Sequence, residues 1–328
     1  MKHRRIVVTG GAGYIGSHVT IALLEAGWEV AIIDDLSTGS RRLVQPGAKL
    51  HIGSTGDRAF TSALFAEFKP DAVIHFAASI SVPESVANPI KYYDNNFVNS
   101  CRLIESCVAS GIDKFVFSST AAVYGSPKIL PVPETAPTAP INPYGSSKLM
   151  TEHMLGDVSR ATKLRYVALR YFNVAGADPK LRAGQVVQNS TNLIKVVSEV
   201  AAGKRKNMTV YGDDYDTADG TGIRDFIHVS DLADAHLCAL DYLSAGGGSE
   251  TANCGYGRGF SVLDVIAAAS NVVGEKLPYN LGPRRPGDPG EVIADVRKIN
   301  ATFPWSPRHQ DLAHIMRTAI AWERAITA

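Results

Sequence analysis

The first half of the chain alternates short apolar or β-branched runs with segments of helical periodicity, and this alternation restricts the possible folds more than any other feature. The candidate strands lie at 6–9, 29–33, 72–75, 114–118 and 165–169, and the candidate helices lie near 14–26, 58–68, 91–110 and 144–160. Strands that alternate with helices build a parallel sheet covered by helices on both faces. We therefore expect an α/β fold with a doubly wound parallel sheet.

The second half of the chain is less regular. Helical patterns near 191–203, 231–243, 261–273 and 311–326 are joined by polar, glycine-rich segments. Within the first half, just before the candidate helix near 144–160, the stretch 126–143 contains six prolines, so it forms neither a helix nor an inner strand. We expect a structured loop there that shapes a ligand cleft, and a smaller mixed α/β domain in the second half of the chain.

Composition excludes several classes of protein. A chain of 328 residues that is 45% hydrophobic and 20% charged is globular and long enough for two lobes. Its formal net charge of +1 attracts neither nucleic acid nor an anionic membrane, so an anionic ligand needs a local site. The four cysteines lack metal-ligand spacing, and no metal site is expected. We expect a cytoplasmic protein without a signal peptide or membrane span.

A glycine-rich run, Thr-Gly-Gly-Ala-Gly-Tyr-Ile-Gly at 9–16, follows the first candidate strand and opens a candidate helix. Its glycines allow a tight turn and a close approach to a pyrophosphate, which the N–H groups of the helix start can bind. Asp34 ends the next strand about 20 residues on, where a carboxylate binds ribose hydroxyls. It also repels a 2′-phosphate, so we expect NAD rather than NADP in a Rossmann-type site, although Arg41 and Arg42 lie nearby.

Tyr144 and Lys148 are four residues apart in a candidate helix that Pro143 can begin. A cation beside a phenol favours the phenolate and lowers a pKa that is ordinarily near ~10, so this pair can act as a proton acceptor. Tyr124 and Lys128 have the same spacing, but Pro127 lies between them and predicts a loop. Spacing and context alone leave a catalytic pair and a surface tyrosine both open.

With these elements in order, and Ser-Ser-Thr at 118–120, the chain resembles the extended short-chain dehydrogenase/reductases. Further segments make it similar to one family among them, the UDP-glucose 4-epimerases, over nearly the whole chain. These segments are 9–18, Tyr-Tyr-Asp-Asn-Asn at 92–96, Arg-Tyr-Phe-Asn at 170–173, the run from 211–215 through 219–229, and Arg-Arg-Pro-Gly-Asp at 284–288.

The resemblance implies reversible epimerisation of UDP-glucose and UDP-galactose through a 4-keto sugar, with bound NAD storing the hydride. Tyr144 is then the acid/base, Lys148 lowers its pKa, and Thr120 links the phenol to the sugar oxygen. A homodimer is also implied. The domains implied are an NAD-binding Rossmann domain at 1–175, rejoined by a segment near 225–256, and a UDP-sugar-binding domain at 176–328.

The family's other binding positions carry over residue by residue. The implied cofactor contacts are Gly10, Gly13, Tyr14, Ile15, Gly16, Asp34, Ser54, Phe76, Ala77, Asn96, Lys148 and Phe172. The implied substrate contacts are Thr120, Tyr144, Asn173, Asn192, Leu193, Tyr211, Arg224, Arg285, Asp288 and Val292. Among these, the two arginines match phosphate-binding positions, and Tyr211 matches a uracil-stacking aromatic.

Three positions depart from the family pattern. Ser54 stands where an acid often reaches the adenine, and Ile80 stands where some members have a pyrophosphate-binding lysine, so cofactor retention is expected to be weaker. Val292 is intermediate in size between the residues associated with plain and N-acetylated hexoses. UDP-GlcNAc/UDP-GalNAc or UDP-pentose 4-epimerisation therefore remains an alternative.

Three rival functions share parts of this pattern. A nucleotide-sugar 4,6-dehydratase needs an acid and a base after the active-site threonine, whereas this chain has Ala121 and Ala122. A noncatalytic NAD-binding sensor would not need Tyr144 and Lys148, which this chain retains. A simple nicotinamide-linked alcohol dehydrogenase would accumulate free NADH, whereas an epimerase would not.

Overall fold

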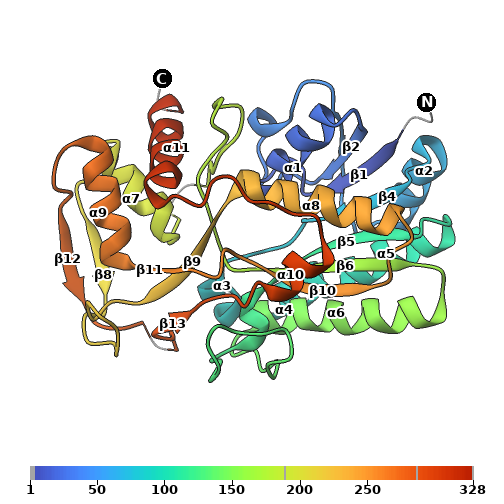
Figure 1. Cartoon of the computed structure of the whole chain (residues 1–328). Coiled ribbons are helices and arrows are strands. Elements are labelled where there is room, and N and C mark those ends of the chain that lie inside the picture. Colours follow the sequence, from blue (N-terminus) through green and yellow to red (C-terminus); the bar gives the residue numbers. More distant parts are fainter. Residues whose placement is uncertain (1–3, 188–189, 286, 327–328) are drawn as a thin grey trace.

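The structure is a computed structural model that describes residues 4–187, 190–285 and 287–326, so Pro286 of the Arg-Arg-Pro-Gly-Asp run lies outside the described residues. A seven-stranded sheet, in which every pairing is parallel, organises one side of the molecule (Figure 1). From edge to edge its strands are β10 (Glu250–Cys254), β6 (Arg165–Tyr171), β5 (Lys114–Thr120), β4 (Ala72–His75), β1 (Arg5–Thr9), β2 (Glu29–Asp34) and β3 (Lys49–Ile52). The chain runs outward from β1 in both directions, which confirms the Rossmann-type fold.

Successive residues of the inner strands pack on opposite faces of this sheet. On β1, Ile6 and Val8 belong to one buried cluster and Val7 belongs to another. The first face is covered by α1 (Tyr14–Glu25) and α8 (Val229–Ser244), and the second by α2 (Arg58–Phe68), α5 (Asn99–Ala109) and α6 (Pro143–Ala161). Burial on both faces explains why these strands are continuous apolar runs instead of alternating ones.

A second core lies beside the sheet and joins three helices to several short strands. The helices are α7 (Leu193–Ala201), α9 (Val262–Val273) and α11 (Leu312–Ala325). Strand β9 (Ile223–His228) pairs with β7 (Asn173–Ala175), β11 (Gly259–Ser261) and β13 (Glu291–Val292), and β8 (Met208–Tyr211) pairs with β12 (Tyr279–Gly282). The short helices are α3 (Val82–Ala87), α4 (Pro89–Tyr92) and α10 (Arg297–Thr302).

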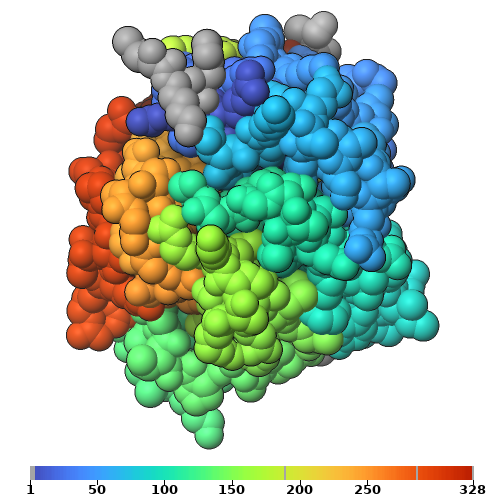
Figure 2. All heavy atoms as spheres, turned by 90° about the vertical axis from the view of Figure 1, so that its right-hand side faces the viewer, coloured from blue at the N-terminus to red at the C-terminus, as the bar shows by residue number. Residues whose placement is uncertain are grey.

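The segment near 225–256 supplies helix α8 and the edge strand β10 of the parallel sheet. The end of α8 and the loop after it are tied to β6, because the Arg165 guanidinium donates to the carbonyl oxygens of Leu243 and Gly247 at 2.9 and 3.0 Å. In the surface view, this late part of the chain lies directly against earlier parts (Figure 2). The exact domain boundaries stay a prediction.

Strands β3 and β7 to β13 are not among the candidate strands, and one candidate helix is interrupted. β3 was not expected as a strand, because Lys49 and Ile52 are exposed and its four residues show no apolar run. The helix expected near 91–110 is interrupted by a π-helical turn at Tyr93–Val98 between α4 and α5. A periodicity of 3.6 residues cannot reveal such a turn, and π-helical turns are frequent at functional sites. Within the described residues, no helix combines the length and apolarity needed to cross a membrane.

Three buried histidines lie in or against the parallel sheet. Burial lowers the pKa of His18 to about 4, that of His75 to about 3 and that of His236 to about 4. Burial has the opposite effect on an acid, and it raises the pKa of Asp225 to about 6. The unfolded chain takes up protons on histidine near pH 6.5, whereas the folded chain does not, so stability falls as the pH falls through this range.

We expect the folded state to be less stable at pH 5.5 than at pH 7.5. Each of the three histidines costs on the order of 1 kcal/mol over this interval, and protonation of Asp225 and of Lys148, whose pKa burial lowers to about 7, offsets part of that cost in the folded state, leaving a net loss on the order of 1–3 kcal/mol. Urea unfolding followed by circular dichroism at the two pH values measures this loss. Equal midpoints at both pH values would contradict it.

Candidate active site

A cavity of about 500 Å³ lies at the carboxyl ends of β1, β2, β4, β5 and β6. It is lined by residues that follow or end those strands, as expected for a doubly wound sheet. The predicted site residues in its wall are Gly10, Gly13, Tyr14, Ile15, Gly16, Asp34, Ser54, Phe76, Ala77, Thr120, Tyr144, Lys148, Phe172, Asn173 and Asn192. The structure therefore brings most of the predicted cofactor contacts and the three predicted catalytic residues to one place.

The glycine loop is built so that only glycine fits at two of its positions. Gly10 has a positive φ of 68°, and a Cβ there would lie 2.7 Å from the backbone nitrogen of Ala77. A Cβ on Gly16 would lie 2.3 Å from the carbonyl oxygen of Gly10, so the first turn of α1 packs directly on the loop. Gly13, the residue before α1, has no capping side chain, which leaves the N–H groups of the helix start for a ligand. This cradle fits a dinucleotide pyrophosphate.

Asp34 ends β2 and faces the cavity. Its carboxylate accepts hydrogen bonds from the backbone nitrogens of Ala12 and Leu36, both at 2.9 Å. Burial raises the pKa of Asp34, and these two N–H groups oppose that effect. A Cβ on Gly39 would lie 2.6 Å from the same carboxylate, so the following loop closes tightly around it. The oxygens keep acceptor capacity for hydroxyl donors, as recognition of a ribose diol requires.

Tyr144 and Lys148 lie on the first two turns of α6, which begins at Pro143 and is capped by Asn142, whose side chain accepts from the Gly145 nitrogen. The Tyr144 phenol is hydrogen-bonded to the Thr120 side chain at the end of β5. Sequence reasoning left open whether this tyrosine is on the surface. The structure places it in the cavity wall, within reach of a hydroxyl partner.

The electrostatics of this pair differ from the sequence-based expectation. Burial raises the pKa of Tyr144, and the hydrogen bond from Thr120 only partly opposes it. The Lys148 ammonium donates to the Ser118 carbonyl oxygen at 2.7 Å and lies 4.9 Å from the centre of the Phe117 ring. Burial lowers the pKa of Lys148 to about 7, and the charge of Glu152 opposes that effect. In the protein alone, burial therefore outweighs any lowering of the tyrosine pKa by Lys148.

Asn96, an expected cofactor contact, is not in the cavity wall. It is only 1% exposed, and its amide is used internally, accepting from the Ser79 nitrogen at 2.8 Å and donating to the Ser79 carbonyl oxygen at 2.9 Å and the Ser147 hydroxyl at 3.2 Å. Its neighbour Asn95 lines the cavity instead. The π-helical turn sets which of the two asparagines faces the cavity, and the sequence pattern gives no signal for that turn.

The remaining predicted substrate residues lie outside this cavity wall, and four of them form two contact pairs. Arg224 is ion-paired with Asp288, and its guanidinium also donates to the Pro289 carbonyl oxygen at 2.8 Å. The Arg285 guanidinium lies over the Tyr211 ring, 4.1 Å from its centre. The last two are Leu193, the first residue of α7, and Val292, which pairs with β9 opposite Arg224 and packs on the apolar cluster that contains Phe172.

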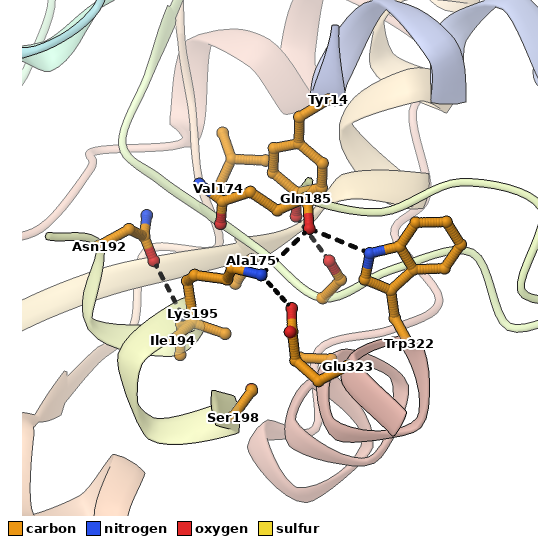
Figure 3. A pocket seen from close by; sticks show the side chains of 12 residues that line it. Tyr14, Val174, Ala175, Gln185, Asn192, Ile194, Lys195, Ser198, Trp322 and Glu323 are labelled. Carbon is orange, nitrogen blue, oxygen red and sulfur yellow. Dashed lines mark hydrogen bonds and ion pairs between the residues drawn. The ribbon is translucent and has the colours of Figure 1, made fainter. Parts of the chain in front are cut away.

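A much smaller cavity of about 10 Å³ (Figure 3) shares four lining residues with the large one: Tyr14, Val174, Gln185 and Asn192. The Lys195 ammonium meets the Glu323 carboxylate there at 2.5 Å, and the Trp322 ring nitrogen donates to the Gln185 carbonyl oxygen at 3.0 Å. The Tyr14 hydroxyl donates to the Gly176 carbonyl oxygen at 2.6 Å. These contacts hold α7, α11 and the segment before α7 together, so the Tyr14 hydroxyl serves the fold.

Sequence reasoning missed several polar residues of the large cavity. Ser79, Ser81 and Lys91 follow β4, and Gln185 lies in the segment before α7. The serines could have been found from their place after a strand end, because ligands bind at that edge of the sheet. Lys91 and Gln185 are brought in by tertiary folding and carry no local signal.

The fold and this cavity define a dinucleotide-dependent enzyme with a Tyr/Lys pair. The family model of the NAD dependent epimerase/dehydratase family matches residues 6–255. A UDP-glucose 4-epimerase from Azospirillum brasilense is 52% identical over 98% of this chain and 92% of the relative. Among solved structures, UDP-glucose 4-epimerase from Brucella ovis in complex with NAD has a TM-score of 0.95 at 41% identity, covering 98% of both chains.

A third similar protein is the UDP-Glc/GlcNAc 4-epimerase from Campylobacter jejuni, with a TM-score of 0.86 at 49% identity over 98% of this chain and 99% of that one. The chain belongs to the NAD dependent epimerase/dehydratase family. Within it, the resemblance to the UDP-glucose 4-epimerases is confirmed.

We expect Gly16→Ala to destabilise the protein by about 1–3 kcal/mol, because the new methyl group forces the first turn of α1 away from Gly10. NAD binding should weaken with it. Thermal unfolding and a titration followed by NADH fluorescence measure the two effects. Gly248→Ala is the matched control, since a Cβ at Gly248 meets nothing within 4 Å and should change neither quantity. Wild-type behaviour of Gly16→Ala would contradict the role given to the loop.

Proposed function

We propose that this protein is an NAD-dependent enzyme that interconverts UDP-glucose and UDP-galactose. One observation carries the proposal: Tyr144, Lys148 and Thr120 share a single cavity with the glycine loop and Asp34. The pyrophosphate cradle and the proton-transfer groups therefore line one cavity, as hydride transfer from a sugar to a bound dinucleotide requires. Membership of the family and the names of its similar proteins support the same reaction.

In this reaction the chain's own residues handle the proton while bound NAD supplies a reversible hydride acceptor. Tyr144 as phenolate takes the proton of the sugar's 4-hydroxyl and later returns it to the same oxygen. Thr120 holds the phenol and offers a hydroxyl toward the sugar oxygen. The positive charge of Lys148 favours the phenolate, and its 2.7 Å bond to Ser118 fixes the ammonium in the wall.

The cofactor contacts proposed are the glycine loop, Asp34 and the cavity-lining residues around Phe76, with Asn95 in place of Asn96. Asp34 is buried, and among the described residues its carboxylate accepts from backbone nitrogens and not from a basic side chain, so it disfavours a 2′-phosphate and favours NAD. The proposed NAD-binding unit is 1–175 with the segment near 225–256. The rest of 176–328 then binds the UDP-sugar.

The nucleotide part of the substrate is proposed to lie along the group formed by Arg224, Arg285, Asp288 and Tyr211. The two guanidinium groups suit bidentate contact with a pyrophosphate, and the Tyr211 ring, 41% exposed, is available to a base. Asn173 and Asn192 line the large cavity and would contact the sugar or its phosphate. With the nucleotide bound by these residues, the two asparagines would guide the sugar toward Tyr144.

A second candidate substrate class is UDP-GlcNAc and UDP-GalNAc. The similar protein from Campylobacter jejuni is a UDP-Glc/GlcNAc 4-epimerase, and Val292 leaves more room than an aromatic residue would.

We also propose a cytoplasmic homodimer. The resemblance supports the dimer, and the free state of all four cysteines is typical of a reducing compartment.

We expect purified protein to convert UDP-galactose to UDP-glucose without added cofactor, since hydride leaves and returns within one site. Chromatographic separation of the products measures the conversion. Incubations with UDP-GalNAc and UDP-xylose test the width of substrate acceptance. If no UDP-glucose forms even when NAD is supplied, the proposed function is wrong; release of NADH into solution would instead indicate an alcohol dehydrogenase.

Tyr144→Phe should lower kcat by ~10²–10⁴, because the phenylalanine ring cannot accept or return the proton. Binding of UDP-galactose, measured by calorimetry, should change little. Tyr166→Phe is the matched control: it removes a hydroxyl from β6 outside the cavity wall and should keep near wild-type turnover. Near-normal turnover by Tyr144→Phe would exclude Tyr144 as the acid/base.

A further inference from the structure

Helix α6 carries a third ionisable residue on the face that holds Tyr144 and Lys148. Glu152 lies one turn beyond Lys148, and the spacing of four residues places all three on one side of the helix. The side chain of Glu152 is only 5% exposed, and Lys148 is 2% exposed. A phenol, an ammonium and a carboxylate therefore follow one another along a buried stripe.

The carboxyl end of β5 meets this stripe residue by residue. The Ser118 carbonyl oxygen accepts from Lys148 at 2.7 Å, and the Ser119 hydroxyl donates to the Glu152 carboxylate. The next residue, Thr120, is bonded to the catalytic phenol. The Glu152 contact thus fixes the strand residue between the two that hold the ammonium and the phenol.

Glu152 is also paired with Arg170 of β6. The guanidinium donates to the two carboxylate oxygens at 3.0 and 2.6 Å, and its third nitrogen donates to the Tyr124 hydroxyl at 2.9 Å. The Tyr124 hydroxyl donates in turn to the Asn253 side chain at 2.6 Å. A bidentate pair with satisfied neighbours has one geometry, so it orients Glu152 rigidly toward β5.

The charge of Glu152 acts on Lys148. Burial lowers the pKa of Lys148 to about 7, and the negative charge of Glu152 opposes that effect. Glu152 is not among the groups that shift the pKa of Tyr144. The other titratable or charged groups around the stripe come from β4, β6, the turn after β5 and the loop before α6; they are His75, Tyr166, Arg170, Tyr171, Tyr124 and Glu134.

We propose that Glu152 is a positioning residue for the epimerase reaction: it holds Ser119 in place between the two catalytic contacts of β5 and favours the charged form of Lys148. This inference rests on the proposed function. Without the carboxylate, Arg170 would stay behind as an unbalanced cation, and Lys148 would lose its proton at a lower pH. At alkaline pH, kcat would then fall, because the Tyr144 phenolate would no longer have the Lys148 ammonium beside it.

The test is the pH dependence of kcat for UDP-galactose in Glu152→Gln, a variant of nearly the same shape. We expect the alkaline limb to move down by about one pH unit or more, since one opposite charge at short range shifts a pKa by about 1–3 units. KM should change far less than kcat. Glu323→Gln is the matched control, because it removes the carboxylate of another buried ion pair, and its alkaline limb should stay in place.

Two further variants separate position from charge. Glu152→Asp retains the charge and should restore the limb toward its wild-type place. If Glu152→Gln does not fold, the double variant Glu152→Met/Arg170→Met removes both members of the buried ion pair, so Arg170 is not left as an uncompensated cation, and it should still show the lowered limb. A limb that stays at the wild-type pH while kcat falls equally at all pH values would overturn the inference. An inactive wild-type protein would instead overturn the proposed function.

Discussion

Every part of the cavity depends on the parallel pairing of β1, β4, β5 and β6, because parallel strands end at the same edge of a sheet. Four separate segments of the sequence contribute residues to one cavity wall: Gly10, Phe76, Thr120 and Tyr171. The close packing of Gly16 on Gly10 then sets the first turn of α1 against that edge. A pyrophosphate cradle and a proton-transfer pair can coexist in this fold because the sheet supplies one rim for both.

This arrangement buries the two reactive side chains, Tyr144 and Lys148, which disfavours their charged forms. Burial raises the pKa of Tyr144 and lowers that of Lys148, so desolvation alone favours the uncharged form of both groups. The opposing contacts come from neighbouring elements: Thr120 and Ser118 from β5, and the charge of Glu152 from the next turn of α6. Each of these contacts favours the charged form of either the phenol or the ammonium. The reactive state of the pair therefore depends on how accurately β5 and α6 are held together, which makes their contacts part of the chemistry.

The sequence was sufficient for elements whose signals are local. The strands β1, β2, β4, β5 and β6, the helices α1, α2, α6 and α8, the glycine loop and Asp34 all have short-range patterns, and the structure places them as predicted. Features that tertiary contact decides were missed. β3 pairs at an edge without an apolar run, the π-helical turn exchanges Asn95 for Asn96 in the cavity wall, and Lys91 and Gln185 arrive there from distant segments. Likewise, spacing placed Tyr144 beside Lys148, but only the packing of β5 on α6 shows how burial and Glu152 set their charges.

Arg224 already has an ion-pair partner, Asp288, so a bound diphosphate would have to compete with that carboxylate for the guanidinium. Arg224 is 17% exposed and Asp288 is 36% exposed, so their ion pair is partly open to water and contributes little to stability. A diphosphate carries more negative charge than one carboxylate and offers several oxygens to the planar guanidinium, so it would compete well for the same donors. Under the proposed function, Asp288 would then be released toward a hydroxyl donor such as a ribose. The ion pair thus holds Arg224 in place before the substrate arrives. Because the pair is partly open to water, exchanging the Asp288 carboxylate for a diphosphate would cost little free energy.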